Sequence, residues 1–277
     1  MSRPAFTPSI TAPLPLAGGQ PRIEPASLSA WGCAGVELRR DQAAALTGAA
    51  RQALRQNLAE AGLGTAFISN LGEAEGAPTL QTLSEALELA AFFGAEYVVT
   101  GAPTRTSSES QAAEWLQAAA GLAEVAGIRL LVENRPGTWA DTGAGFDKFM
   151  SRSASPWLQI AFDPAGFVAL REHPFLTAFM PGHLKSRLQV LRVRDARFED
   201  SHVVPVNDGN AEIAELVSAA LARGFGGFFA VGTAEAGPDD VRRALTEFNE
   251  LLAALGLDWA GAPGRALEWT THSEITS

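Results

Sequence analysis

The ends of the apolar segments recur at a regular interval, and this spacing restricts the folds open to the chain. Each segment is short, rich in aliphatic or aromatic residues, and ends in a polar residue or a glycine. The interval is about 30 residues, the length of one strand followed by one helix. The segments end at Glu37, Asn70, Gly101, Glu133, Asp163, Arg192 and Gly232. Repeated units of this length predict a parallel α/β fold, and eight of them would close into a single (βα)8 barrel.

The apolar pattern also locates the expected strands and helices. We expect strands over residues 6–11, 34–39, 64–70, 97–100, 128–133, 158–163, 188–193 and 228–231. Between them, apolar residues at three- or four-residue spacing predict helices, one of which would include Leu46, Leu54 and Leu58. Thr79 and Asn210 are placed to cap two of these helices. An open doubly wound sheet would use the same alternation, but we find no Gly-rich turn between a strand and a helix.

The whole chain, residues 1–277, is expected to form one barrel domain. Residues 1–30 contain a Pro/Gly-rich N-terminal segment, and residues 257–277 form a C-terminal extension. Two tryptophans in this extension, Trp259 and Trp269, need apolar cover. The barrel or a second subunit would supply it, so a homodimer is a possible assembly.

Charge and cysteine content limit the classes of function. The formal net charge is −10, which argues against binding the phosphates of a nucleic acid. The sequence has one cysteine, so it has neither an internal disulfide nor a cluster of zinc-binding thiolates. We find no apolar run long enough for a membrane helix and no signal peptide. A cytoplasmic protein acting on a small-molecule substrate, without nucleic acid or membrane, is expected.

Charged and amide side chains gather at the predicted strand ends. In a barrel, the carboxyl ends of all strands meet at one mouth, where the active site lies. Glu133 and Asp163, on neighbouring strands, would suit a hard cation or an acid/base pair. The alternative is that these carboxylates simply form ion pairs with Arg192 and Arg39. The complete predicted set is Glu37, Arg39, Asn70, Glu133, Arg135, Asp163, Arg192 and Arg194.

Four short motifs carry a resemblance to a known superfamily. They are Val36-Glu37-Leu38-Arg39, Leu131-Val132-Glu133-Asn134, Phe162-Asp163 and the stretch from Asn207 to Ile213. Their order and spacing resemble those of the xylose isomerase-like TIM barrels, which include sugar phosphate isomerases, epimerases and endonuclease IV. The resemblance implies a divalent metal, usually manganese, held by Glu, Asp, His and Glu from the later strands. It also implies that the two glutamates move a proton beside the carbonyl group of a sugar.

Only half of that metal site is present in the sequence. Glu133 and Asp163 match the first two ligands, but Arg192 stands where the resemblance expects the histidine. The second glutamate would fall near Gly232, and the nearest acid is Glu235. A guanidinium cannot bind a cation, so we expect Arg192 to occupy roughly the place of the metal. The cofactor prediction is therefore no metal, or a weakly bound Mn, Mg or Zn ion.

Two functions remain open. The first is a sugar or sugar phosphate isomerase or epimerase of carbohydrate metabolism, with Glu133 and Glu235 as catalytic residues. Its substrate would be bound by Glu37, Arg39, Asn70, Arg135, Arg192 and Arg194. The second is a metal-free, non-catalytic protein whose arginines bind an anionic small molecule. Endonuclease IV chemistry is not expected, because the four histidines do not fall at strand ends.

Overall fold

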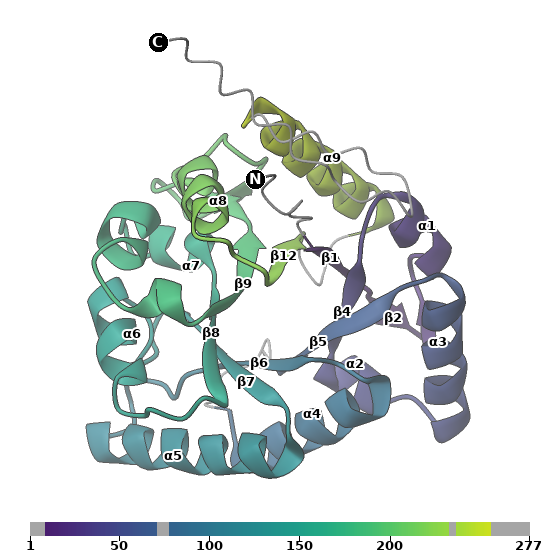
Figure 1. Ribbon diagram of the computed structural model, residues 1–277, viewed down its shortest axis with the longest axis horizontal. Helices are drawn as coiled ribbons and strands as arrows, with labels where there is room; N and C mark the ends of the chain where they lie inside the picture. The colour runs from purple at the N-terminus through teal and green to yellow at the C-terminus, as the bar shows by residue number, and fades with distance from the viewer. Residues whose placement is uncertain (1–8, 71–77, 233–236, 256–277) are drawn as a thin grey trace, which may run out of the picture.

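The computed structural model describes residues 9–70, 78–232 and 237–255. Eight parallel strands form a closed barrel, in the order β1-β4-β5-β6-β7-β8-β9-β12 and back to β1. Figure 1 shows them at the centre of a ring of helices. The strands are β1 (Ser9–Pro13), β4 (Gly35–Arg39), β5 (Gly64–Asn70), β6 (Tyr97–Gly101), β7 (Arg129–Glu133), β8 (Leu158–Phe162), β9 (Leu188–Val193) and β12 (Phe228–Val231). The predicted (βα)8 fold is confirmed.

Helices cover the outside of the barrel and fill the connections between strands. They are α1 (Pro25–Ala30), α2 (Arg40–Ala44), α3 (Gly48–Glu60), α4 (Leu80–Phe93), α5 (Glu109–Ala126), α6 (Gly143–Met150), α7 (Pro164–Val168), α8 (Ile213–Ala222) and α9 (Pro238–Ala254), with the short helices η1 (Pro174–Phe179) and η2 (Leu184–Ser186). Thr79 caps α4 as expected, its hydroxyl accepting from the Thr82 N–H at 3.1 Å. No helix in the described residues is long and apolar enough to cross a membrane.

Two local expectations were wrong, and the end of one strand differs. β1 extends to Pro13, beyond the predicted end at Thr11, and residues 6–8 of that prediction lie outside the described part. Leu46 belongs to no helix, because the chain forms α2 and then restarts as α3 behind Thr47. Asn210 does not cap α8; its side chain accepts from the Phe198 N–H at 2.9 Å.

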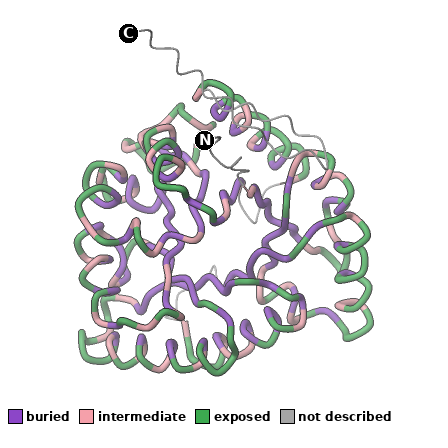
Figure 2. Tube along the Cα trace, in the orientation of Figure 1, coloured by how far each residue is buried: buried purple, intermediate pink, exposed green. Residues whose placement is uncertain are grey.

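The apolar core has two layers, one inside the barrel and one between strands and helices. In Figure 2 the barrel strands are mostly buried, whereas the surrounding helices alternate between buried and exposed residues. Side chains alternate between the layers along the strands, except that the neighbours Ala66 and Phe67 in β5 both lie in the inner layer. The inner layer consists of Ala66, Phe67, Tyr97, Val99, Leu131, Ala161, Val190 and Ala230. Glu133 lies two residues beyond Leu131, and Arg192 two beyond Val190. The alternation therefore directs both charged groups into the barrel at its carboxyl end.

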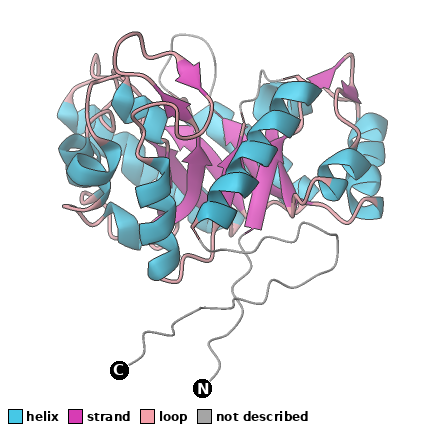
Figure 3. Ribbon diagram, turned by 90° about the horizontal axis from the view of Figure 1, so that it is seen from above, coloured by secondary structure: helices cyan, strands magenta, loops and turns pink. Residues whose placement is uncertain are grey.

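Two small antiparallel pairs extend the carboxyl end of the barrel. The pair β2 (Leu16–Ala17) and β3 (Gln20–Pro21) follows β1, and β10 (Asp195–Ala196) and β11 (Val203–Val204) follow β9. Figure 3 shows these short strands beyond one end of the barrel strands. They form part of the wall around the site.

Candidate functional site

The guanidinium of Arg192 lies between two buried carboxylates. Its Nε donates to Oε2 of Glu133 at 2.7 Å, and both terminal nitrogens donate to the carboxylate of Glu37, Nη2 reaching Oε1 at 3.2 Å. The Phe67 ring lies 5.2 Å from the guanidinium carbon and forms an apolar floor. These three charged side chains are all less than one-tenth exposed. The positive charge of Arg192 is therefore shared between two carboxylates, Glu37 in β4 and Glu133 in β7.

Asp163 has a different partner. It follows β8 directly, and its Oδ2 accepts from Nη2 of Arg194 at 2.5 Å. Arg39 forms a two-bond ion pair with Asp41, at 3.0 and 2.8 Å. Glu133 therefore bonds to Arg192, as one of the sequence interpretations expected. Asp163 bonds to Arg194, and Arg39 bonds to the nearby Asp41.

Burial governs the acid strength of this cluster. It raises the pKa of the Glu133 carboxyl above the usual value of 4.5; the charge of Arg192 opposes the shift without cancelling it, and the charge of Asp163 adds to it. Burial alone would lower the pKa of Arg192, but Glu133 and Glu37 outweigh it and raise that pKa. Arg192 therefore stays charged, while Glu133 is a stronger base than an exposed glutamate.

Asn134 fixes the main chain beside the site, and sequence reasoning did not single it out as a site residue. Its Nδ2 donates to the Asp163 carbonyl at 2.8 Å, and its Oδ1 accepts from the Asp163 N–H at 2.7 Å. Asn134 is 1% exposed, so water does not compete for these bonds. Its position directly after Glu133, at the end of a buried strand, was the available signal.

Asp195 organises the loop that carries the fourth sequence motif. Its two carboxylate oxygens accept from the main-chain N–H groups of Ala196, Asn207, Gly209 and Ala211, at 2.8 to 3.0 Å. A Cβ at Gly209 would lie 2.4 Å from Oδ1 of Asp195, so a side chain has no room there. The loop is folded around this carboxylate, which explains why the motif contains glycine.

The other predicted site residues lie around this cluster. The Asn70 amide donates to the Thr82 hydroxyl at 3.4 Å, and Arg135 lies in the turn after β7, where its carbonyl accepts from Thr138. Glu235 lies outside the described residues. Gly232 has φ of +90°, a conformation that side-chain-bearing residues rarely adopt, so this strand end favours glycine over the expected glutamate.

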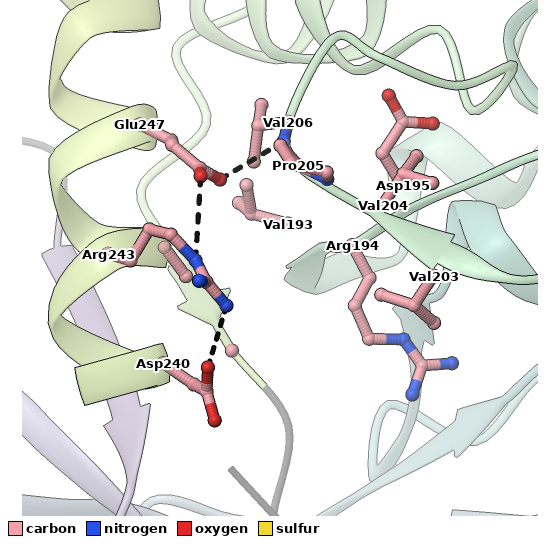
Figure 4. A pocket seen from close by; sticks show the side chains of 12 residues that line it. Val193, Arg194, Asp195, Val203, Val204, Pro205, Val206, Asp240, Arg243 and Glu247 are labelled. Carbon is pink, nitrogen blue, oxygen red and sulfur yellow. Dashed lines mark hydrogen bonds and ion pairs between the residues drawn. The ribbon is translucent and has the colours of Figure 1, made fainter. Parts of the chain in front are cut away.

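A cavity of about 360 Å³ lies beside Arg194 at the carboxyl end of the barrel. Figure 4 shows α9, with Asp240, Arg243 and Glu247, on one side and Arg194 and Val203 on the other. Arg243 donates to Asp240 at 2.6 Å, and Glu247 accepts from the Val206 N–H at 3.2 Å. Val193, Val203, Val206 and Ala244 form its apolar lining.

The side chains at the barrel mouth do not fit a divalent metal. Glu133 and Asp163 each bond to a guanidinium, and Arg192 puts a permanent positive charge beside Glu133. A cation would be repelled by that charge and would have to displace an ion pair at each ligand. Among the described residues, no group of three or more His, Cys, Asp or Glu is placed to hold a metal ion.

Solved structures with the same fold include enzymes of several kinds. A probable 3-DHS dehydratase, AsbF, from Bacillus anthracis matches with a TM-score of 0.69 and 14% identity, over 87% of this chain and 98% of that one. The 3-keto-D-glucoside 4-epimerase YcjR from E. coli gives 0.67 and 14%, over 88% and 100%. Endonuclease IV from Thermus thermophilus gives 0.66 and 21%, over 89% and 100%. At these identities the likeness establishes the fold alone.

Sequence comparison places the chain in a family. A search of curated proteins gives no significant match. The sequence profile of the xylose isomerase-like TIM barrel family matches residues 25–259, which is most of the chain. The match spans the strands that carry Glu37, Glu133 and Arg192, together with Asp163. The chain belongs to the xylose isomerase-like TIM barrel family.

Proposed function

We propose that this protein is a metal-independent isomerase that moves a proton beside the carbonyl group of a small polyhydroxy substrate. The observation that carries the proposal is Glu133, a buried carboxylate at the carboxyl end of β7 that bonds to Arg192. Barrel enzymes place their chemistry at this end. Family membership supports a reaction of the isomerase or epimerase class, and the geometry supports doing it without a metal.

Glu133 has the properties of a general base. Its pKa is raised by burial, which brings its basicity closer to the strength useful near neutral pH. It would take a proton from the carbon next to the carbonyl group, leaving an enediolate. For an aldose–ketose interconversion, the hydroxyl proton of the enediolate then moves to the former carbonyl oxygen, and Glu133 returns its proton to the former carbonyl carbon. The permanent charges of Arg192 and Arg194 stabilise the negative charge of the enediolate.

The number of bases bears on the type of isomerisation. A single carboxylate takes and returns a proton on one face of the substrate, which is the geometry of an aldose–ketose interconversion. Inverting one carbon requires a base on each face. Glu133 is the predicted base that lies within the described residues. Both reactions begin when this carboxylate takes the proton next to the carbonyl group, and the proposal covers either one.

The alternative function, binding of an anion by an arginine-rich pocket, has less support. Arg39, Arg192 and Arg194 each form an ion pair with a carboxylate. Arg135 also has a polar or electrostatic partner. An incoming anion would have to compete with these contacts for every guanidinium. The paired arginines are better suited to orienting carboxylates than to capturing a phosphate.

Deuterium incorporation from solvent tests the proposed reaction. The protein is incubated with aldoses and ketoses in deuterated water containing EDTA, and exchange at the carbons next to the carbonyl is followed by NMR. We expect exchange that persists in EDTA and falls by about 100-fold or more in Glu133→Gln, the effect typical of losing a general base. Glu250→Gln, an exposed substitution on α9, should leave the rate unchanged. No exchange with any sugar, or exchange abolished by EDTA, contradicts the proposal.

A further inference from the structure

Two polar atoms in the site have no hydrogen-bond partner in the described residues. They are Oδ1 of Asp163 and Nε of Arg194, and both atoms are buried. The Asp163 side chain is only 6% exposed. An unpaired buried polar atom is destabilising, so such atoms are uncommon and call for a partner such as a water molecule, an ion or a ligand.

The two atoms are of opposite type and belong to side chains that bond to one another. Oδ1 of Asp163 accepts hydrogen bonds, whereas Nε of Arg194 donates one. Their side chains are already joined through the other carboxylate oxygen and Nη2, at 2.5 Å. A hydroxyl group can donate to the first atom and accept from the second. A phosphate oxygen can only accept, and an ammonium group can only donate.

The charge of the cluster also favours a neutral group. Glu37, Glu133 and Asp163 supply three carboxylates, whereas Arg192 and Arg194 supply two guanidiniums. One excess negative charge remains when all five are ionised, and it disfavours a second anion beside the cluster. The Arg194 side chain is 33% exposed, so a change of its rotamer can admit a ligand from the barrel mouth.

A cavity on the Arg194 side of the pair could take the rest of such a ligand; Arg194 lines it, whereas Asp163 does not. Its volume of about 360 Å³ is within the usual range for small-molecule sites. Val193, Val206 and Ala244 line it with apolar surface. Arg243, a second cation on its wall, is bonded to Asp240. This cavity therefore suits uncharged parts of a substrate better than a phosphate group.

We propose that Asp163 and Arg194 are a specificity-determining pair that binds one hydroxyl of a neutral polyhydroxy substrate and excludes phosphorylated and carboxylated analogues. This inference rests on the proposed function, because it names the substrate class of the same site. It assigns Asp163, the residue expected to ligate a metal, to substrate selection.

Binding of matched ligand pairs tests this selectivity. The intact protein is mixed with D-fructose, D-glucose, D-mannose or myo-inositol, and separately with the phosphate ester of each, and affinity is measured by ligand-observed NMR. At least one neutral compound should bind about tenfold or more tightly than its ester. An ester that binds as tightly as its neutral parent, or no binding in any pair, overturns the inference.

Two variants make the test specific to the pair. Asp163→Asn removes the excess negative charge and the ion pair of Arg194, so the preference should shift toward the ester by about tenfold. Arg194→Lys keeps the charge but loses Nε, and should weaken binding of the neutral ligand; it also serves if Asp163→Asn does not fold. Glu250→Gln and Arg242→Lys are the matched controls on the exposed face of α9. Unchanged preference in both site variants overturns the inference.

Failure of the inference can be distinguished from failure of the proposed function. Deuterium exchange that depends on Glu133, together with equal binding of neutral and phosphorylated ligands, retains the isomerase and removes the role of Asp163 and Arg194. Selective binding of neutral ligands without any exchange retains the specificity pair and removes the isomerase.

Discussion

Arg192 forms ion pairs with two buried carboxylates, those of Glu37 and Glu133. Its removal leaves Glu37 and Glu133 buried without their cation, and breaking a buried ion pair typically costs about 3–5 kcal/mol. We expect Arg192→Met to lower the free energy of unfolding by this amount in urea denaturation at neutral pH. Arg242→Met, on an exposed helix face, should change it by less than about 0.5 kcal/mol. Equal effects of the two variants would show that the Arg192 network contributes nothing to stability.

At the same scale, sequence reasoning found the charged residues but not all of their partners. Strand alternation is enough to predict that Glu133 and Arg192 point into the barrel. The partner of Arg192 depends on how the strands are staggered on closing, which brings Glu37 to it and leaves Asp163 to Arg194. Stagger is a property of the closed barrel and has no local sequence signal. The bonds of Asn134 to the main chain of Asp163 join two neighbouring strands, and the position of Asn134 at a strand end signals a buried polar residue without naming this partner.

The loop between β9 and α8 depends on one close approach of backbone and side chain. Gly209 has no space for a Cβ, which would lie 2.4 Å from Oδ1 of Asp195. Gly209→Ala should therefore displace the Asp195 carboxylate and destabilise the protein by about 1–3 kcal/mol, the usual cost of overpacking. Gly226→Ala is the matched control, since a Cβ there meets no atom within 4 Å. Thermal and urea unfolding of both variants measure the difference, and equal stability would contradict the role of Asp195.

The loops after β6 and β7 are joined by an ion pair that predicts a pH dependence. Burial opposes the charge of Asp141, but the hydrogen bond and the charge of Arg105 outweigh it and hold the pKa of this carboxyl below 3.8. A lowered folded-state pKa contributes stability above the unfolded pKa and loses it as pH falls through the folded value. Asp141→Asn should thus cost about 1–2 kcal/mol at pH 7 and pH 5, less than a fully buried pair because Arg105 is 46% exposed.

The check is the stability difference between wild type and Asp141→Asn at several pH values. It should be constant from pH 7 to pH 5 and shrink as pH falls through 3.8, where the carboxyl is half protonated in the unfolded chain, toward the lower pKa of the folded state. A difference that grows on acidification would refute this account of the two loops.

Helix ends were predictable where the capping signal is local. Thr79 and Gly94 bound α4 as their residue types indicate. The prediction for Asn210 was wrong because its side chain bonds to the Phe198 N–H across the loop; Glu212, in a left-handed conformation, precedes the first residue of α8 at Ile213. An Asn side chain can cap a helix or bond to other backbone groups, and here the bond to Phe198 replaces the cap.

For the molecule as a whole, the order of strands was predictable because each βα unit repeats one apolar pattern. That regularity fixes a parallel barrel without knowledge of any loop. The roles of Glu235 and of residues 257–277 fall outside the described residues. The homodimer and the cytoplasmic location stay predictions.

The guanidinium of Arg192 bonds to Glu133 at the place where the family resemblance implies a metal ion. The most direct test of this claim is the metal content of the purified protein after dialysis against manganese and then against metal-free buffer, measured by mass spectrometry per chain. We expect well below one ion per chain, because the carboxylates of Glu133 and Asp163 already form ion pairs with Arg192 and Arg194. One equivalent of manganese or zinc that is retained by the wild type and lost in Glu133→Gln would contradict the claim.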